Sequence, residues 1–127
     1  MDLSDTHPDK KIDRLHEYIA NEIALADDSL AAGDHVAAKH HLERAHILGQ
    51  AFTADHTRVH FRMLRLGWRM RDVREVVGQL IRIVGAATKT PFGIYPTGNT
   101  GGADVWFFQS RPIPDDLLKI LNEAKLS

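Results

Sequence analysis

Apolar residues recur at three- and four-residue spacings over most of the first 88 residues, which is the pattern of amphipathic helices. The first stripe predicts a helix from residue 9 to about residue 32, with Ile12, Leu15, Ile19, Ile23, Ala26 and Leu30 on its inner face. Gly33 and Asp34 follow as a helix stop and a new N-cap, because glycine adopts the left-handed conformation easily and aspartate accepts hydrogen bonds from free amides. This break predicts an antiparallel helical hairpin.

The next two helices are separated by a short polar turn. The second helix is expected over roughly residues 35–52. The third runs to about Met70, with Thr53 or Asp55 as its N-cap. Because the connection is short, the two helices are expected to lie antiparallel.

A fourth helix is predicted up to residue 88. Asp72 and Glu75 stand at its N-cap and N3 positions, as in a capping box. Its predicted inner face consists of Val73, Val76, Val77, Leu80, Ile81, Val84 and Ala87. Residues 9–88 are therefore expected to form an antiparallel four-helix bundle or two stacked helical hairpins, so the fold class is all-α.

The composition changes after Thr88 to a segment rich in glycine, proline and aromatic residues. Residues 89–113 are expected to be irregular, with a short strand at 105–108, and residues 114–125 to form a C-terminal helix beginning at Pro114. The aromatic residues of this segment are Phe92, Tyr95, Trp106, Phe107 and Phe108. We expect them to fold back on the bundle or onto a second subunit of a homodimer, all within one domain of residues 1–127.

The composition limits the classes of protein and of site. The chain has 127 residues, of which 43% are hydrophobic and 26% charged, as in a globular domain. It has no cysteine, so disulfides and cysteine-rich zinc sites are excluded, and any transition-metal site must use imidazole and oxygen ligands. No signal peptide or long apolar run is evident, so we expect a cytoplasmic protein that does not associate with a membrane.

Charge is distributed unevenly, although the net charge is only -1. Residues 1–34 hold nine acidic and three basic residues, whereas residues 56–82 hold seven arginines against Asp72 and Glu75. The arginines that form a row on the outside of the third helix are Arg58, Arg62, Arg65 and Arg69. We interpret this asymmetry as two halves that pack on one another or meet across an oligomer interface, in preference to a nucleic-acid surface.

Five of the eight histidines fall between residues 40 and 60, on the second and third helices, where they suggest a metal site. Glu43 and His46 are three residues apart, and His56 and His60 are four apart, so each pair shares a helix face. The hairpin brings His46 to the level of the other two histidines, and Glu22 of the first helix to a similar level. The pattern predicts a divalent transition-metal site (zinc, iron, copper or nickel) with Glu43, His46, His56 and His60, and Glu22 as a fifth ligand.

An alternative interpretation is that these histidines are hydrogen-bonded structural residues beside the core. The Glu-x-x-His spacing of carboxylate-bridged di-iron bundles occurs only once, and those sites need it twice. No His-Glu-x-x-His motif of metalloproteases is present. We therefore assign no catalytic residue and no organic cofactor.

The glycine-rich loop Gly98–Gly102 resembles a phosphate cradle only superficially. Backbone amides around glycines can converge on an anion, but the Gly-Lys-Ser/Thr of a P-loop and its strand-loop-helix context are missing. The loop is better interpreted as a turn that lays the aromatic segment on the bundle, with Asn99 at a turn position.

Several segments together resemble one known family. They are HLERAHILGQ (41–50), the pair His56 and His60, RDVREVVGQLIR (71–82), GNTGGADV (98–105) and PIPDDL (112–117). Over roughly residues 10–125 the chain resembles a small bacterial family catalogued as domain of unknown function 3703. The resemblance implies a standalone cytoplasmic single-domain protein and no settled activity. Its motif positions would fall on Glu43, His46, His56, His60, Asn99, Gly101 and Gly102.

Two hypotheses about function follow from these observations. The first is a small helical protein that binds a divalent metal through histidine and glutamate, as an accessory, buffer or sensor protein and not as an enzyme. The alternative is a non-catalytic interaction module, resembling a single tetratricopeptide hairpin, that binds a protein partner through its aromatic tail or arginine row. A non-haem iron or zinc enzyme is a third class.

Overall fold

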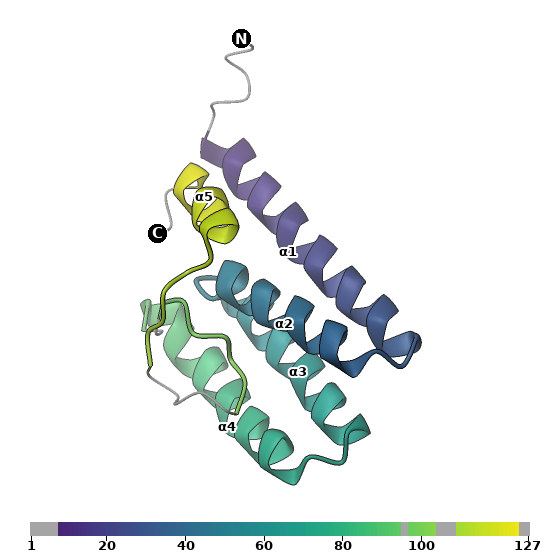
Figure 1. Ribbon diagram of the computed structural model, residues 1–127. Helices are drawn as coiled ribbons and strands as arrows, with labels where there is room; N and C mark the ends of the chain where they lie inside the picture. Colours follow the sequence, from purple (N-terminus) through teal and green to yellow (C-terminus); the bar gives the residue numbers. More distant parts are fainter. Residues whose placement is uncertain (1–7, 95–96, 104–108, 125–127) are drawn as a thin grey trace.

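The computed structural model describes residues 8–94, 97–103 and 109–124, and its described residues form helices, turns and loops without a strand (Figure 1). The helices are α1 (Pro8–Ala31), α2 (His35–Gly49), α3 (Thr53–Arg69), α4 (Val73–Lys89), the 3-10 helix η2 (Thr90–Phe92) and α5 (Asp115–Glu123). The all-α fold class is confirmed. The predicted strand at 105–108, with Trp106 and Phe107, lies outside the described residues. No helix of the described chain is long and apolar enough to cross a membrane.

The helices form two hairpins placed side by side (Figure 1). Helix α1 packs along α2, α3 packs along α4, and contacts between α2 and α3 join the pairs. Helix α5 contacts α1 and α2. The hydrophobic core consists of Leu15, Ile19, Ile23, Ala26, Leu30, Ala38, Leu42, Ala45, Ile47, Leu48, Val59, Met63, Leu66, Leu117 and Leu121. Helix α4 contributes no residue to this described core cluster, so other contacts must hold it in place.

Two of the predicted helix starts are confirmed, and one is wrong. Gly33 has φ +78°, and the Asp34 carboxylate accepts a 3.0 Å hydrogen bond from the amide of Ala37. Asp72 likewise caps α4 by accepting from the amide of Glu75 at 3.1 Å. Helix α3, by contrast, follows an N-cap residue, Phe52, that is extended and makes no side-chain cap.

Asp55 does not cap α3 because its carboxylate has other partners. It is buried in the first turn of the helix and lies 2.8 Å from Nδ1 of His16. The same carboxylate accepts from the guanidinium of Arg58. Arg62 is also paired, with Asp27 of α1 at 3.0 Å. Two members of the predicted arginine row therefore make ion pairs within the chain, one of them between its acidic and basic parts.

The face of α4 predicted to be internal is not internal. Gln79 and Ala86 are the buried residues of this helix. The apolar residues that remain exposed are Val73, Val77, Leu80, Ile81 and Val84. The helix is rotated from the predicted orientation because its inner side is occupied by polar contacts, above all those of Gln79 with a group of histidines on α2 and α3.

Candidate metal centre

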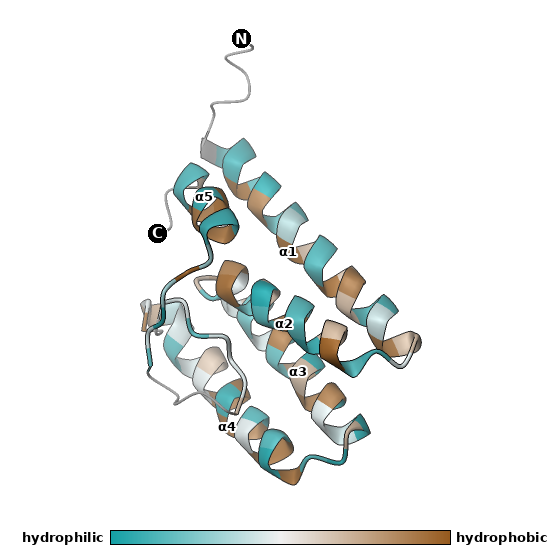
Figure 2. Ribbon diagram, viewed as in Figure 1, coloured by the Kyte–Doolittle hydropathy of each residue, from teal (hydrophilic) through white to brown (hydrophobic). Residues whose placement is uncertain are grey.

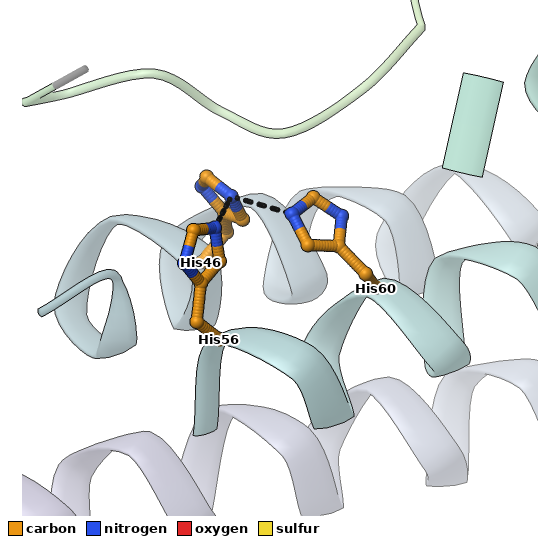
Figure 3. A group of neighbouring side chains, drawn as sticks. All are labelled: His46, His56 and His60. Carbon is orange, nitrogen blue, oxygen red and sulfur yellow. Dashed lines mark hydrogen bonds between the residues drawn. The ribbon is translucent and has the colours of Figure 1, made fainter. Parts of the chain in front are cut away.

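Three histidines meet between α2 and α3 (Figure 3). His46 lies in the last turn of α2, while His56 and His60 project from one face of α3, four residues apart. Nε2 of His46 is 3.0 Å from Nε2 of His56 and 3.1 Å from Nε2 of His60. The three residues are 2%, 6% and 2% exposed. One ligand nitrogen from each lies within 4.8 Å of the others, so the group can hold a metal ion.

The outer nitrogen of each ring, Nδ1, has its own oxygen partner. The three partners are the main-chain oxygen of Asn99 for His46 (2.6 Å), the hydroxyl of Thr90 for His56 (2.7 Å) and the amide oxygen of Gln79 for His60 (2.6 Å). These partners come from the 97–103 loop, η2 and α4, respectively. Histidine ligands of metals typically donate their second N–H in this way, which fixes the ring and leaves Nε2 free to bind the metal.

The partners of His46 and His60 determine which nitrogen carries the proton. A main-chain carbonyl only accepts hydrogen bonds, so Nδ1 of His46 must be the donor to Asn99. The amide nitrogen of Gln79 donates to Glu75 and to the carbonyl of Gly101, at 2.6 and 2.8 Å. Its amide oxygen therefore faces His60, whose Nδ1 must also be a donor. In the neutral state, both Nε2 atoms then carry lone pairs.

These lone pairs face one another at 3.1 Å across the His46–His60 pair. Such an approach is repulsive unless a positive charge, a proton or a metal ion, lies between the nitrogens. Burial lowers the pKa of His60 to about 3 and, with the neighbouring histidines, that of His46 well below its ordinary value. Burial also lowers the pKa of His56 to about 4. At neutral pH a proton is therefore disfavoured, and a metal ion is the better partner.

The spacing of the nitrogens is close to that required by a tetrahedral metal. Two nitrogens that each lie about 2.0–2.1 Å from zinc are about 3.3 Å apart in tetrahedral geometry. The observed distances from His46 to its two neighbours are 3.0 and 3.1 Å. A small outward movement of the rings would thus admit the ion. Neutral imidazoles are suitable ligands for zinc, copper, nickel and iron.

The 97–103 loop closes the group on the side of His46. Gly101 has φ +85°, and a Cβ built on it would lie 2.5 Å from Cδ2 of His46, so only glycine fits against the ring. The Asn99 side chain holds the loop in shape by accepting from the amide of Gly101 and donating to the carbonyl of Gln109, both at 2.8 Å. The glycine-rich loop therefore packs on His46, a role that the sequence analysis did not predict for it.

The structure does not bring the two predicted carboxylate ligands into this group. Glu43 lies 3.8 Å from Lys39 and lines a small cavity with Met63. Glu22 accepts from Nε of Arg44, and its second oxygen lies near Nδ1 of His41, at 2.8 Å in each case. Among the described residues, the group that could hold a metal ion consists of His46, His56 and His60.

The sequence analysis did not predict two residues that bond to the histidines, Gln79 and Thr90. Both are buried polar residues beside histidines, at 0% and 4% exposure. Gln79, Ala86 and Thr90 are seven and four residues apart and lie on one side of the chain, opposite the apolar stripe of α4. A single glutamine inside a strongly apolar helical run was the available signal, but it was masked by the larger number of valines and isoleucines.

Comparison with known proteins places the chain in a family without supplying a function. Neither the search of curated proteins nor the search of solved structures finds a match. A family model described as "Protein of unknown function (DUF3703)" matches residues 13–121, which covers all three histidines, Gln79, Thr90 and the 97–103 loop. The chain therefore belongs to the DUF3703 family.

Proposed function

We propose that this protein binds one divalent transition-metal ion, with Zn²⁺ as the best match, through Nε2 of His46, His56 and His60. The single observation that carries the proposal is the contact between two unprotonated nitrogens, His46 and His60 Nε2, at 3.1 Å. Their protonation is fixed from outside by Asn99 and Gln79. A bound cation turns this unfavourable contact into two coordinate bonds.

The arrangement supports a buffer or sensor role more than simple transport. The three rings are buried, and Gly101 packs against the ring of His46, so the 97–103 loop would hinder release of the ion on that side. The outer partners join α4, η2 and this loop to the histidine group. Helix α4 adds nothing to the described hydrophobic core cluster, and the bond of Gln79 to His60 helps to position it on α3. Metal occupancy would therefore be coupled to how firmly α4 and the loop are held.

Metal content and titration test the proposal directly. The untagged full-length chain should contain, or take up, about one equivalent of zinc by elemental analysis and calorimetry at neutral pH. At a free metal concentration 100-fold above Kd, binding should stabilise the fold by about 2.7 kcal/mol, and a chelator should reverse the gain. For a chain of this size, that corresponds to a rise in Tm on the order of 10 °C.

Single substitutions identify the ligands. His46→Ala, His56→Ala and His60→Ala should each reduce metal affinity by more than the 10–100-fold typical of a lost outer partner. His40→Ala is the matched control, because His40 lies on the same pair of helices but is exposed. Glu43→Gln and Glu22→Gln should also leave the affinity unchanged, since both carboxylates are engaged elsewhere. Absence of uptake of zinc, cobalt, nickel and copper would overturn the proposal.

The protonation states can be measured without any metal. Long-range nitrogen–proton NMR spectra of the metal-free protein at pH 7 should show His46 and His60 as neutral rings protonated at Nδ1. The exposed His40 should show the mixed tautomers of a solvated histidine. If one of the two rings is instead protonated at Nε2, that N–H can donate to Nε2 of the other ring, and the argument for a cation fails.

A further inference from the structure

A large apolar surface covers the outer side of the α3–α4 hairpin. It consists of Phe61, Leu64 and Trp68 of α3 and Val73, Val76, Val77, Leu80, Ile81 and Val84 of α4, and we call it the hairpin face. Figure 2 shows hydrophobic residues recurring along successive turns of α4. Seven of the nine side chains are between 51% and 74% exposed. Part of the face forms an open groove of about 500 Å³ between Phe61, Trp68 and Leu80.

The size of the hairpin face exceeds what a monomer usually exposes. A whole aromatic side chain covers roughly 150–250 Å² and an aliphatic one somewhat less, so these exposed fractions amount to an apolar area on the order of 800 Å². The largest apolar patch on a typical monomer is about 300–600 Å². A stable interface of standard size buries about 800 Å² on each partner. The hairpin face is therefore large enough to form such an interface alone.

The distribution of charge on α4 favours a partner with the same surface. The exposed stripe Val73, Val77, Leu80, Ile81 and Val84 carries no charge along the whole helix. The arginines that line the groove, Arg65 and Arg69, lie on α3. A two-fold axis close to α4 would put the uncharged stripes of two copies together and leave the arginines of both copies at the outer edges.

Gly85 adds a second observation on the same helix. Glycine inside a helix costs about 1 kcal/mol relative to alanine, so it normally serves close packing. A Cβ on Gly78 would lie 2.9 Å from Ala103, which accounts for that glycine, but a Cβ on Gly85 would meet nothing within 4 Å. Gly85 is half-buried and four residues after Ile81, so it borders the exposed stripe on the side of Ile81. Its lack of a side chain allows another helix to approach closely there.

We propose that the chain forms a two-fold homodimer in which the α4 helices of two copies pack against each other through the hairpin face. Two antiparallel hairpins that pack face to face in this way make a four-helix bundle. The inference does not depend on the metal site. The histidine group lies on the opposite side of α4, where Gln79 is buried, so each copy would keep its own site.

Sedimentation velocity of the full-length chain, over a concentration series reaching tens of micromolar, tests the dimer. We expect a species of about twice the monomer mass of 14.3 kDa. Val77→Asp and Ile81→Asp should convert it to monomer while far-ultraviolet circular dichroism and metal content stay unchanged. Val36→Asp is the control, because Val36 is 81% exposed on α2, outside the hairpin face. It should leave the dimer intact.

Gly85→Leu separates a packing defect from a folding defect. Within one copy a Cβ on Gly85 meets nothing within 4 Å, so the variant should fold at least as well as the wild type. Its dimer should nevertheless be weaker and dissociate at a higher protein concentration than the wild-type dimer. A wild-type chain that stays monomeric throughout the series would overturn the proposal. A dimer unaffected by Val77→Asp, Ile81→Asp and Gly85→Leu would do the same, because association would then use another surface. Binding of a monomer to vesicles of anionic lipid would also overturn it.

Discussion

The amide oxygen of Gln79 lies 2.6 Å from Nδ1 of His60, while the amide nitrogen of the same side chain donates to Glu75 and to Gly101. This arrangement leaves the glutamine one orientation and the histidine one tautomer. A residue outside the three histidines thus decides that Nε2 of His60 carries the lone pair that could bind a metal ion. The same side chain joins α4 to α3 and to the 97–103 loop, so it links the chemistry of the site to the packing of the fold.

Replacing Gln79 should therefore separate metal affinity from stability. Gln79→Met keeps the approximate volume but removes the acceptor for His60, so metal affinity should fall by about 10–100-fold. Gln79→Glu keeps an acceptor for His60 but faces the Glu75 carboxylate, so it should lower stability while retaining most of the affinity. Calorimetry and thermal unfolding measure the two effects. Equal affinities for both variants and the wild type would show that Gln79 does not control the ligand.

Thr90 offers a matched pair with Thr88, two residues earlier. Thr90 is buried and bonded to Nδ1 of His56, whereas Thr88 is exposed and bonds to the carbonyl of Val84 on its own helix. Thr90→Val should cost about 1–3 kcal/mol in the metal-free protein, because it leaves a buried nitrogen unpaired. It should also weaken metal binding. Thr88→Val should change neither the stability nor the metal affinity. Similar losses in both variants would mean that they arise from a change in helix propensity and not from the bond to His56.

The metal-free protein should lose stability in mild acid. In the unfolded chain a histidine takes up a proton near pH 6.5, but in the folded chain the pKa is about 4 for His56 and about 3 for His60, because burial disfavours the charged ring. The unfolded state therefore binds more protons as the pH falls from about 6.5 towards 4. Each such histidine should remove stability at about 1.4 kcal/mol per pH unit in that window. Above about pH 6.5 their contribution is constant.

Denaturant unfolding between pH 7.5 and 5 measures this slope. His60→Gln should make it shallower, because it removes one histidine whose pKa is lowered by burial. His40→Gln replaces an exposed histidine of α2 and is the control for the loss of an imidazole. A saturating metal should shift the loss of stability to lower pH, because protons must displace the ion before they reach the rings. An unchanged slope in His60→Gln would contradict the assignment of this buried histidine as neutral.

The sequence identified the parts of the fold that depend on local chemistry. Gly33 and Asp34 mark the first turn because a left-handed glycine and an aspartate cap are requirements of a few adjacent residues. His46, His56 and His60 were found because helical spacing and one short turn suffice to bring them together. Glu43 satisfied the same spacing rule but is not in the ligand group, because its carboxylate is directed to Lys39. Spacing indicates a face and leaves the direction of a long side chain open.

The orientation of α4 could not be predicted from hydrophobicity. Its apolar stripe was the strongest signal of that segment, yet the structure turns Gln79 inward and leaves Val77 and Ile81 exposed. The inward orientation of Gln79 depends on partners that lie far away in the sequence, among them His60 and Gly101. Only the assembled site makes burial of a glutamine favourable, because all of its polar atoms are then satisfied. An apolar stripe directed outward is also what an interface between subunits would produce.

Gly101 provides the sharpest test of the loop that covers the histidines, because Gly93 is a natural control. Both residues have positive φ, +85° and +72°, so alanine at either position carries a similar backbone strain, on the order of 1 kcal/mol. A Cβ on Gly93 meets nothing within 4 Å, whereas a Cβ on Gly101 would lie 2.5 Å from the ring of His46. Gly101→Ala should therefore destabilise the fold more than Gly93→Ala.

The difference between these two variants isolates the contact with His46. In Gly101→Ala the loop or the ring must move, which lengthens the 2.6 Å bond between Nδ1 of His46 and the carbonyl of Asn99. Metal affinity should fall by about 10–100-fold, as expected when an outer partner of a ligand is lost. Gly93→Ala should bind metal as the wild type does. Equal metal affinity and equal unfolding midpoints in the two variants would mean that the loop does not press on the site.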